Sequence, residues 1–269
     1  MKAKLSTGVK PRDSFAFASD TKWVRVKMNE LTGNNMLSYG SDSGGAFSDS
    51  DLIQGTLTAI WNTTVGAFDT NGDNATLITH DCGEICRLDN LDGTIMFHYK
   101  YGGNTAGTSG ASYGFTYRNP TAGNGWNIQI NNNLLPQIKL TQDGTNHTVS
   151  GSAGTAYTDI ADEIEGITGL IYRSGGTGNQ TITMYGKGEL IATKADDAKE
   201  IDETSGNLWI HGRGTDGGAA AAHTPSGVLT GDVIVIRTSK DLRSHAQRIA
   251  NDWDNNQWEQ SKVLADLGV

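Results

Sequence analysis

Proline, cysteine and long apolar runs are all scarce in this 269-residue chain. It contains 4 Pro against 35 Gly, so glycine makes its turns and a disordered Pro-rich chain is excluded. No segment approaches the roughly 18 apolar residues of a membrane span. Residues 1–5 begin like the basic end of a secretory signal, but no apolar run follows them. We therefore expect synthesis in the cytosol, or export without a cleavable signal.

Positive charge is also in short supply. The chain has 21 Lys and Arg against 30 Asp and Glu, a formal net charge of -9. This balance argues against binding nucleic acid or an anionic membrane through bulk electrostatics. The length suffices to bury a full core, and an all-β sandwich of this size is commonly one domain.

What the sequence does have is alternation, clearest in residues 180–193, QTITMYGKGELIAT. Ile182, Met184 and Leu190 alternate with polar residues, as half-buried strands do. Between the two runs, the glycines of Tyr-Gly-Lys-Gly (185–188) can supply the positive φ angles of a tight hairpin. Residues 169–172 predict a preceding strand. This meander is the strongest structural signal in the chain.

Short strands separated by glycine- and asparagine-rich turns are predicted along most of the chain. They fall at 23–28, 52–64, 75–79, 85–88, 93–100, 112–118, 126–130, 135–141, 147–150, 207–212 and 226–237. Residues 233–236 are apolar on both faces, which indicates a central strand.

The character changes at residues 241–251, which predict a helix capped by Ser239 or Asp241. One face of that helix would carry Leu242, Ala246, Ile249 and Ala250. The fold class we expect is all-β, an antiparallel jelly-roll β-sandwich with a short C-terminal helix. Its parts would be an N-terminal arm (1–20), the sandwich (21–253) and a C-terminal tail (254–269).

The order of these segments resembles the laminin-G-like branch of the concanavalin A-like lectin/glucanase superfamily. The similarity rests on GLIYR (169–173), TITMYGKGELIAT, NLWIHGR (207–213), the strand from 226 and RSHAQRIAND (243–252). Two positions depart from the family: residues 165–168 replace a frequent Trp-His pair, and Lys187 replaces an Asp of the hairpin turn. Domains of this branch in bacteriophage virion proteins often end in Asn-Pro-Trp, and this chain has Asn251-Asp252-Trp253.

The function that this resemblance implies is a non-enzymatic structural or adhesion protein of a bacteriophage particle, as capsid decoration, surface knob or fibre component. Such a protein would be made in the host cytoplasm and reside in the virion. Its partners would be other virion proteins of the capsid or tail, further copies of itself in a homo-oligomer, and a surface glycan, with no nucleic acid and no membrane insertion. The alternatives are a free carbohydrate-binding, lectin-like module and a polysaccharide-degrading enzyme with an atypical site.

A hydrolytic site would need two carboxylates flanking the glycosidic bond. Glu200 and Asp202 would share a strand face, but Thr204 stands where the second catalytic Glu belongs. Threonine cannot act as a general acid near neutral pH. We therefore expect no catalytic residues.

Metal binding has two candidate segments. Asp69, Asn71 and Asp73 have the oxygen spacing of a calcium loop, although an EF-hand would continue differently and Asx-rich turns without metal are common. The family resemblance implies calcium at a loop edge, so calcium is the one cofactor suggested. Cys82 and Cys86 allow two thiols, a small disulfide, or a zinc site that also uses His80 and His98.

Aromatic residues supply the remaining candidates. Trp126 and Tyr117 are candidate carbohydrate-binding residues, although Trp126 alternates with Ile128 and Ile130 and so would share the core face with them. Apolar residues in excess at the two ends of the chain predict contacts with a partner, or a cover over the chain's own sandwich. These are Phe15, Phe17, Trp253 and Trp258.

Overall fold

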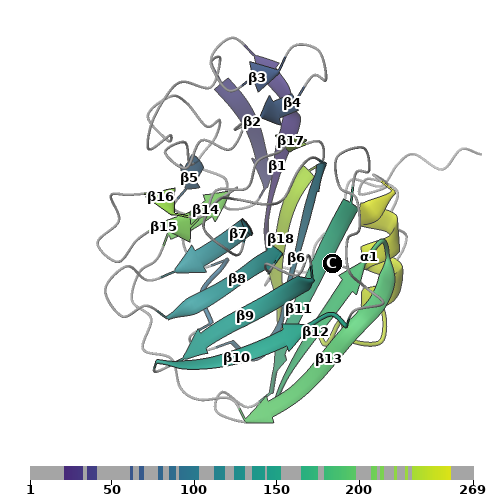
Figure 1. Ribbon diagram of the computed structural model, residues 1–269. Coiled ribbons are helices and arrows are strands. Elements are labelled where there is room, and N and C mark those ends of the chain that lie inside the picture. Colours follow the sequence, from purple (N-terminus) through teal and green to yellow (C-terminus); the bar gives the residue numbers. More distant parts are fainter. Residues whose placement is uncertain are drawn as a thin grey trace, which may run out of the picture.

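Two large facing antiparallel sheets, a two-stranded sheet and one helix make up the part of the chain that the computed structural model describes (Figure 1). The described residues are 21–32, 35–40, 61–62, 67–69, 78–80, 85–88, 91–102, 112–118, 124–130, 135–142, 144–152, 165–174, 179–197, 207–210, 213–214, 221–222, 228–229 and 232–255. Among them, no helix has the length and apolar character needed to cross a bilayer. The expected fold class, an antiparallel β-sandwich with a short C-terminal helix, is confirmed.

The larger sheet has ten strands. Seven follow the order β13-β12-β11-β6-β17-β4-β3, and the other three branch from β6: β18 pairs with β6, β1 pairs with β18, and β2 pairs with β1. Its strands are β1 (Lys22–Thr32), β2 (Asn35–Gly40), β3 (Trp61–Asn62), β4 (Ala67–Asp69), β6 (Gly93–Gly102), β11 (Glu165–Arg173), β12 (Asn179–Gly186), β13 (Glu189–Asp197), β17 (Val228–Leu229) and β18 (Asp232–Thr238).

The smaller sheet has six strands in the order β10-β9-β8-β7-β14-β5. They are β5 (Ile78–His80), β7 (Ser112–Arg118), β8 (Gly125–Ile130), β9 (Pro136–Gln142), β10 (Thr145–Ser150) and β14 (Asn207–Ile210). A two-stranded sheet joins β15 (Arg213–Gly214) to β16 (Ala221–Ala222).

The hairpin between β12 and β13 forms as expected, but with different turn residues. Lys187 and Gly188 adopt positive φ angles of 52° and 75°, so Lys187 rather than Gly186 takes the first left-handed position. A register shift follows Met184, which places Leu190 opposite Tyr185 on the outer side of the sheet. Leu190 is therefore 53% exposed, whereas Ile182 and Met184 are buried as their alternation predicts.

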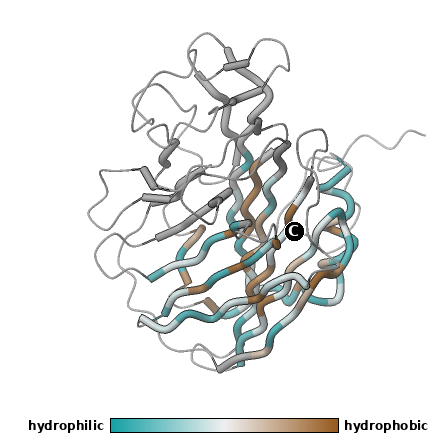
Figure 2. The backbone as a smooth tube through the Cα atoms, viewed as in Figure 1, coloured by the Kyte–Doolittle hydropathy of each residue, from teal (hydrophilic) through white to brown (hydrophobic). Residues whose placement is uncertain are grey.

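Strand β18 is central, as its doubly apolar sequence predicts. It pairs with β1 on one side and β6 on the other. Val233 and Val235 face the smaller sheet, while Ile234 and Ile236 belong to the cluster under the helix. Figure 2 shows the resulting concentration of hydrophobic positions along the strands of the larger sheet.

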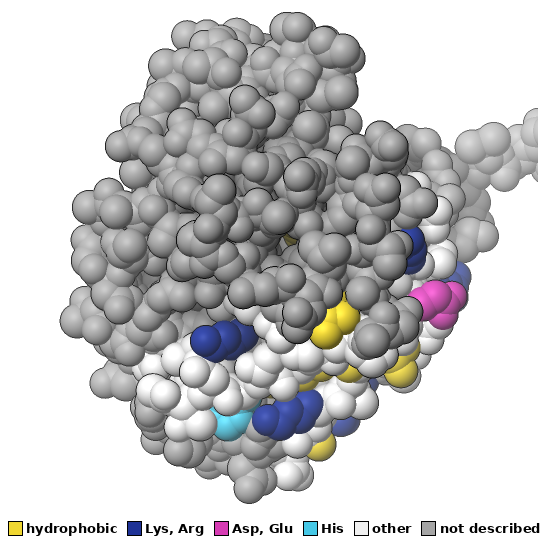
Figure 3. Space-filling view, in the orientation of Figure 1, with side chains coloured by type: hydrophobic (Ala, Val, Ile, Leu, Met, Phe, Trp, Pro, Cys, Tyr) yellow, Lys and Arg dark blue, Asp and Glu magenta, His cyan; other side chains and the backbone are white. Residues whose placement is uncertain are grey.

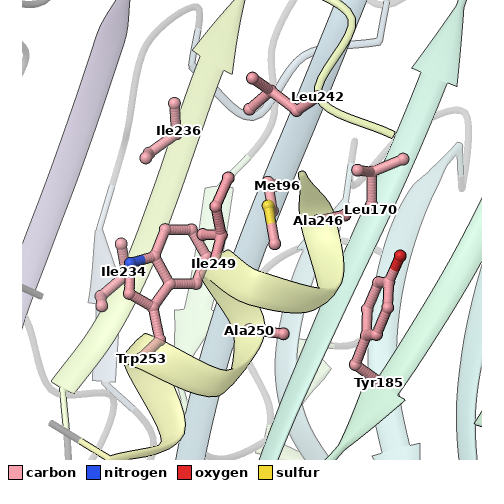
Figure 4. Packing of buried hydrophobic residues seen from close by; sticks show 10 residues of the cluster. All are labelled: Met96, Leu170, Tyr185, Ile234, Ile236, Leu242, Ala246, Ile249, Ala250 and Trp253. Carbon is pink, nitrogen blue, oxygen red and sulfur yellow. The ribbon is translucent and has the colours of Figure 1, made fainter. Parts of the chain in front are cut away.

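Helix α1 (Ala246–Asp254) covers the outer side of the larger sheet. It begins later than expected, with His245 at its N-cap position, because Asp241 instead accepts a hydrogen bond from the backbone amide of Arg243. Ala246, Ile249 and Ala250 form the buried face as predicted, and Trp253 extends it (Figure 4). Leu242, also predicted on this face, is buried in the same cluster but precedes the helix. Its buried residues pack on Met96, Leu170, Tyr185, Ile234 and Ile236.

The space between the sheets is filled from both sides. The Phe97 ring stacks on Trp126 with centroids 4.2 Å apart and an interplanar angle of 10°. Gly169 lets this happen, because a Cβ there would overlap the Phe97 ring and crowd Ile138. The interior around Phe97 and Trp126 is therefore closely packed, and the side chains in contact there are uncharged.

Residues 85–88 form a turn at one end of this interior and not the strand that the sequence predicts. Three successive carbonyls accept hydrogen bonds from side chains of both sheets. Trp126 Nε1 donates to Cys86 over 2.8 Å, Arg173 Nη1 donates to Leu88 over 2.7 Å, and the Arg237 guanidinium donates to Arg87. These acceptors therefore serve side chains and are not used in a strand ladder.

Candidate ligand-binding face

The outer face of β8, β9 and β10 is the polar counterpart of the helix-covered face. Alternation turns Trp126, Ile128, Ile138 and Leu140 inward, where they are buried. The opposite positions carry only small polar or amide side chains and one lysine. They are Asn127 and Gln129 in β8, Gln137, Lys139 and Thr141 in β9, and Asn146, Thr148 and Ser150 in β10.

The strand register arranges these residues, which we call the polar face, in rows across the sheet. The first row is Gln129–Gln137–Ser150. Gln129 Nε2 donates to Gln137 Oε1 over 2.7 Å, and Gln137 Nε2 donates to the Ser150 hydroxyl over 2.8 Å. Each amide therefore orients the next, and the row forms a pre-arranged array of donors and acceptors.

The other two rows complete the array. The middle row is Asn127–Lys139–Thr148, and the third is Gly125–Thr141–Asn146, in which the Thr141 hydroxyl donates to Asn146 Oδ1 over 2.9 Å. Strands lie about 4.8 Å apart and alternate residues about 6.7 Å apart. The polar face therefore measures about 10 Å by about 13 Å.

Accessibility falls steadily across this face. Asn146 and Ser150 on β10 are exposed, the three β9 residues are half-buried, and Asn127 and Gln129 on β8 are only 8% and 6% exposed. Asn127 Oδ1 and Gln129 Oε1 are fully buried and accept no hydrogen bond. Buried acceptors of this kind cost free energy unless a donor reaches them. The least accessible edge of the polar face thus holds two acceptors that lack donors.

Among the described residues in the view of Figure 3, dark blue cations lie among white atoms of backbone and uncharged side chains, and magenta acidic atoms appear at the right-hand margin. None of the described residues of the polar face is acidic.

A second polar group lies inside the sandwich. Gln142 and Gln180 project from opposite sheets, are fully buried, and are joined by a hydrogen bond of 3.2 Å from Gln142 Nε2 to Gln180 Oε1. Arg173 lies beside Gln180 across the β11–β12 pair. This group bridges the two sheets inside the core, and there Gln142 Oε1 and Gln180 Nε2 also have no hydrogen-bond partner.

Of the two predicted carbohydrate-binding residues, the structure describes the side chain of Trp126 but not that of Tyr117. Trp126 is 1% exposed, stacked on Phe97 and hydrogen-bonded to Cys86, so the structure corrects its assignment to a sugar site. Its alternation with Ile128 had favoured the core. Tyr117 lies in β7, opposite Trp126, and its side chain is outside the described residues.

The predicted partner contact at Trp253 is also corrected, because this side chain is 1% exposed and belongs to the chain's own core. Phe15, Phe17 and Trp258 lie outside the described residues.

The metal predictions remain largely untested. Asp69 ends β4, and Asn71 and Asp73 lie outside the described residues. No cluster of three or more metal-ligating side chains occurs in the part of the chain that the structure describes. His98 bonds to Thr168 over 2.8 Å beneath α1, on the opposite side of the sheet from the Cys86 carbonyl. The structure therefore does not join His98 to Cys86 in a zinc site; Cys82, Glu200 and Asp202 are not among the described residues.

The polar face was missed by the sequence reasoning, although a signal existed. The segments WNIQI (126–130) and QIKLTQ (137–142) alternate apolar residues with amides, lysine and threonine. The apolar residues of these segments predict the strands, and the polar residues that alternate with them predict the polar face.

Comparison with solved structures supports the architecture. The chain resembles the receptor-binding domain of botulinum neurotoxin C/D mosaic serotype, with a TM-score of 0.52, 12% identity, and coverage of 88% of this chain and 51% of that one. The botulinum neurotoxin serotype G binding domain gives a TM-score of 0.52 and 14% identity over 88% of this chain and 50% of that one. This chain thus spans about half the length of these toxin domains.

A smaller part of the chain resembles the Ruminococcus gnavus IT-sialidase CBM40 bound to alpha2,3 sialyllactose, with a TM-score of 0.44, 16% identity, and coverage of 60% of this chain and 83% of that one. No protein-family model matches the sequence, and no curated protein matches it either. What the comparison with the two neurotoxin domains shows is the fold, an antiparallel β-sandwich.

Proposed function

We propose that this protein is a non-catalytic carbohydrate-binding module that holds a glycan on the polar face of β8, β9 and β10. The observation that carries the proposal is the pair of buried acceptors, Asn127 Oδ1 and Gln129 Oε1, for which the described residues supply no donor. Sugar hydroxyl groups are donors as well as acceptors, so they are the kind of group that would satisfy these oxygens. Because both oxygens are closed to solvent, a glycan would have to displace the groups that cover them.

The rest of the polar face fits the same class of ligand. Its amides and hydroxyls are arranged in rows by hydrogen bonds, so little side-chain freedom remains to be lost on binding. An apolar ligand would leave these groups unpaired, and a nucleic acid would call for several cations. A chain of sugar rings offers hydroxyls at a spacing that the rows can meet.

The lectin-like fold supports this choice over the others. The C/D mosaic neurotoxin domain is a receptor-binding domain, so this architecture serves recognition in that protein. The described residues of the polar face include no carboxylate, and glycoside hydrolysis ordinarily needs two. Binding without hydrolysis is therefore the function we propose.

The bacteriophage setting stays a prediction that rests on the sequence resemblance. A glycan-binding sandwich on a virion would serve adhesion to a host surface, so the two ideas are compatible. Electron microscopy of particles carrying a labelled copy of the chain tests the virion location and the contacts with capsid or tail proteins.

A glycan array with the purified chain tests the proposed function directly. We expect selective retention of a defined set of glycans, and loss of that retention in the double variant Asn127→Leu/Gln129→Met, which keeps the side-chain shapes but removes both acceptors. Leu190→Ala, on the opposite sheet, is the matched control and should bind like the wild type. A reducing-sugar assay on each bound glycan should give no product.

Absence of any retained glycan would overturn the proposal. So would unchanged binding by the double variant, since the ligand would then lie elsewhere on the chain.

A further inference from the structure

The middle of the polar face carries its one charged residue among those described, Lys139. The strand register gives Lys139 the lateral neighbours Asn127 and Thr148, and the neighbours Gln137 and Thr141 along β9. The four diagonal positions are Gly125, Gln129, Asn146 and Ser150. All eight surrounding positions are therefore uncharged.

Lys139 is half-buried and forms no ion pair with any residue that the structure describes. Among the described residues, none of the eight positions around Lys139 on this face is acidic. By contrast, the exposed cation Arg243 near α1 pairs with Asp241 over 2.7 Å. Lys139 thus keeps its full donor capacity toward a ligand.

The charge of the rest of the chain makes the Lys139 ammonium group more distinctive as a binding site for anions. The whole chain has a net charge of -9, so an anionic ligand is repelled over most of the surface. A local ammonium group surrounded by neutral amides is where such a ligand would be favoured. Hydrogen bonds between ionised partners are also stronger than those between neutral ones.

From this arrangement we infer that the polar face selects acidic glycans, with the Lys139 ammonium binding a carboxylate or sulfate group while the neighbouring amides and hydroxyls bind the sugar hydroxyls. The inference rests on the proposed function, because it names the substrate class of the same face. Lys139 would then determine specificity, and Asn127 and Gln129 would determine whether sugar is bound at all.

Matched pairs of glycans test the inference. The first pair is a galacturonic acid oligomer and its methyl ester, which differ in charge and share a sugar skeleton. The second pair is sulfated lactose and lactose. Calorimetric titration of the wild type should give at least tenfold tighter binding of the charged member of one pair or both, and the pair that responds identifies carboxylate or sulfate.

Two variants at the same position locate the preference. In Lys139→Met the ratio of charged to neutral affinity should fall toward one, while Lys139→Arg should retain it because the charge remains. Leu190→Ala should keep the wild-type ratio. Equal thermal melting of all variants and the wild type confirms that the fold is intact.

The outcomes separate the two proposals. Equal binding of charged and neutral members by the wild type, or an undiminished preference in Lys139→Met, overturns the selection of acidic glycans but leaves carbohydrate binding standing. Failure of every glycan to bind above the level of Asn127→Leu/Gln129→Met overturns both.

Discussion

The two outer faces of the sandwich are built by the same strand alternation and have opposite characters. On the larger sheet, Met96, Leu170, Ile234 and Ile236 project outward and are covered by α1. On the smaller sheet, the equivalent positions of β8, β9 and β10 carry amides, hydroxyls and Lys139. An apolar outward face requires a cover, and a polar one can face a ligand.

The difference shows how a nine-residue helix contributes to a sandwich of this size. Ala246 and Ala250 allow the α1 backbone to approach the sheet, and Ile249 and Trp253 fill the space beside Met96 and Ile234. Burial of each large apolar side chain contributes roughly 1.5 to 3 kcal/mol. The covered face therefore stabilises the fold, whereas the polar face retains buried acceptors that reduce stability.

The largest expected effect on stability comes from a substitution in the helix-covered face. Trp253→Ala should lower the free energy of unfolding by about 3 to 5 kcal/mol, because it removes the largest side chain between α1 and the sheet. Urea denaturation followed by fluorescence and circular dichroism measures the loss. Leu190→Ala, on the same sheet but 53% exposed, is the control and should change stability by less than about 0.5 kcal/mol. A loss below about 1 kcal/mol for Trp253→Ala would mean that the helix is not needed as a cover.

A smaller effect of opposite sign is expected on the polar face. Asn127→Leu preserves the branched shape and removes a buried acceptor that has no donor, so it should raise stability by about 1 kcal/mol. The same change should abolish glycan binding, so stability and function would move in opposite directions. Thr148→Val, a shape-preserving change at a half-buried position with no such acceptor, should leave stability nearly unchanged. Destabilisation by Asn127→Leu would show that its amide is already satisfied.

The smallest effect concerns the approach to α1, where Arg243 lies over the Tyr172 ring and pairs with Asp241. The pKa of the Asp241 carboxyl is lowered, chiefly by hydrogen bonds from the Arg243 side chain, against the opposing effect of burial. A lowered folded-state pKa stabilises the fold above the ordinary value of about 3.9 and loses that effect as the pH falls through the folded-state pKa.

Asp241→Asn should therefore cost at most about 0.5 kcal/mol at pH 7, since the pair is exposed and screened by salt. The difference from the wild type should vanish as the pH falls through the lowered folded-state pKa of Asp241. Melting temperatures across this range measure it, and a difference that persists in acid would exclude the ion pair as its cause.

Much of the architecture could be predicted from local pattern. The alternation in residues 180–193 specified the β12–β13 hairpin, and the doubly apolar run at 233–236 specified a central strand. The helix face of Ala246, Ile249 and Ala250 followed from helical spacing, whereas Leu242 precedes the helix. These features depend on residues close together in the sequence, so the sequence alone was sufficient for them.

What the sequence determined by itself is therefore which residues alternate, and where the clearest strands lie, although residues 85–88 form a turn and the helix begins at Ala246 and not at Asp241. Only the tertiary structure decided what covers each face. Alternation assigns Trp126 and Asn127 to opposite sides of β8. It cannot show that the Trp126 ring stacks on Phe97, which lies 29 positions earlier in the sequence. Nor can it show that Asn127 Oδ1 is buried with no donor among the described residues. Likewise, the register shift after Met184 exposes Leu190. Trp253 is buried because it packs against the outward-facing apolar residues of β6, β11 and β18. Pairing between distant strands depends on the packing of the whole sandwich, which no local pattern contains.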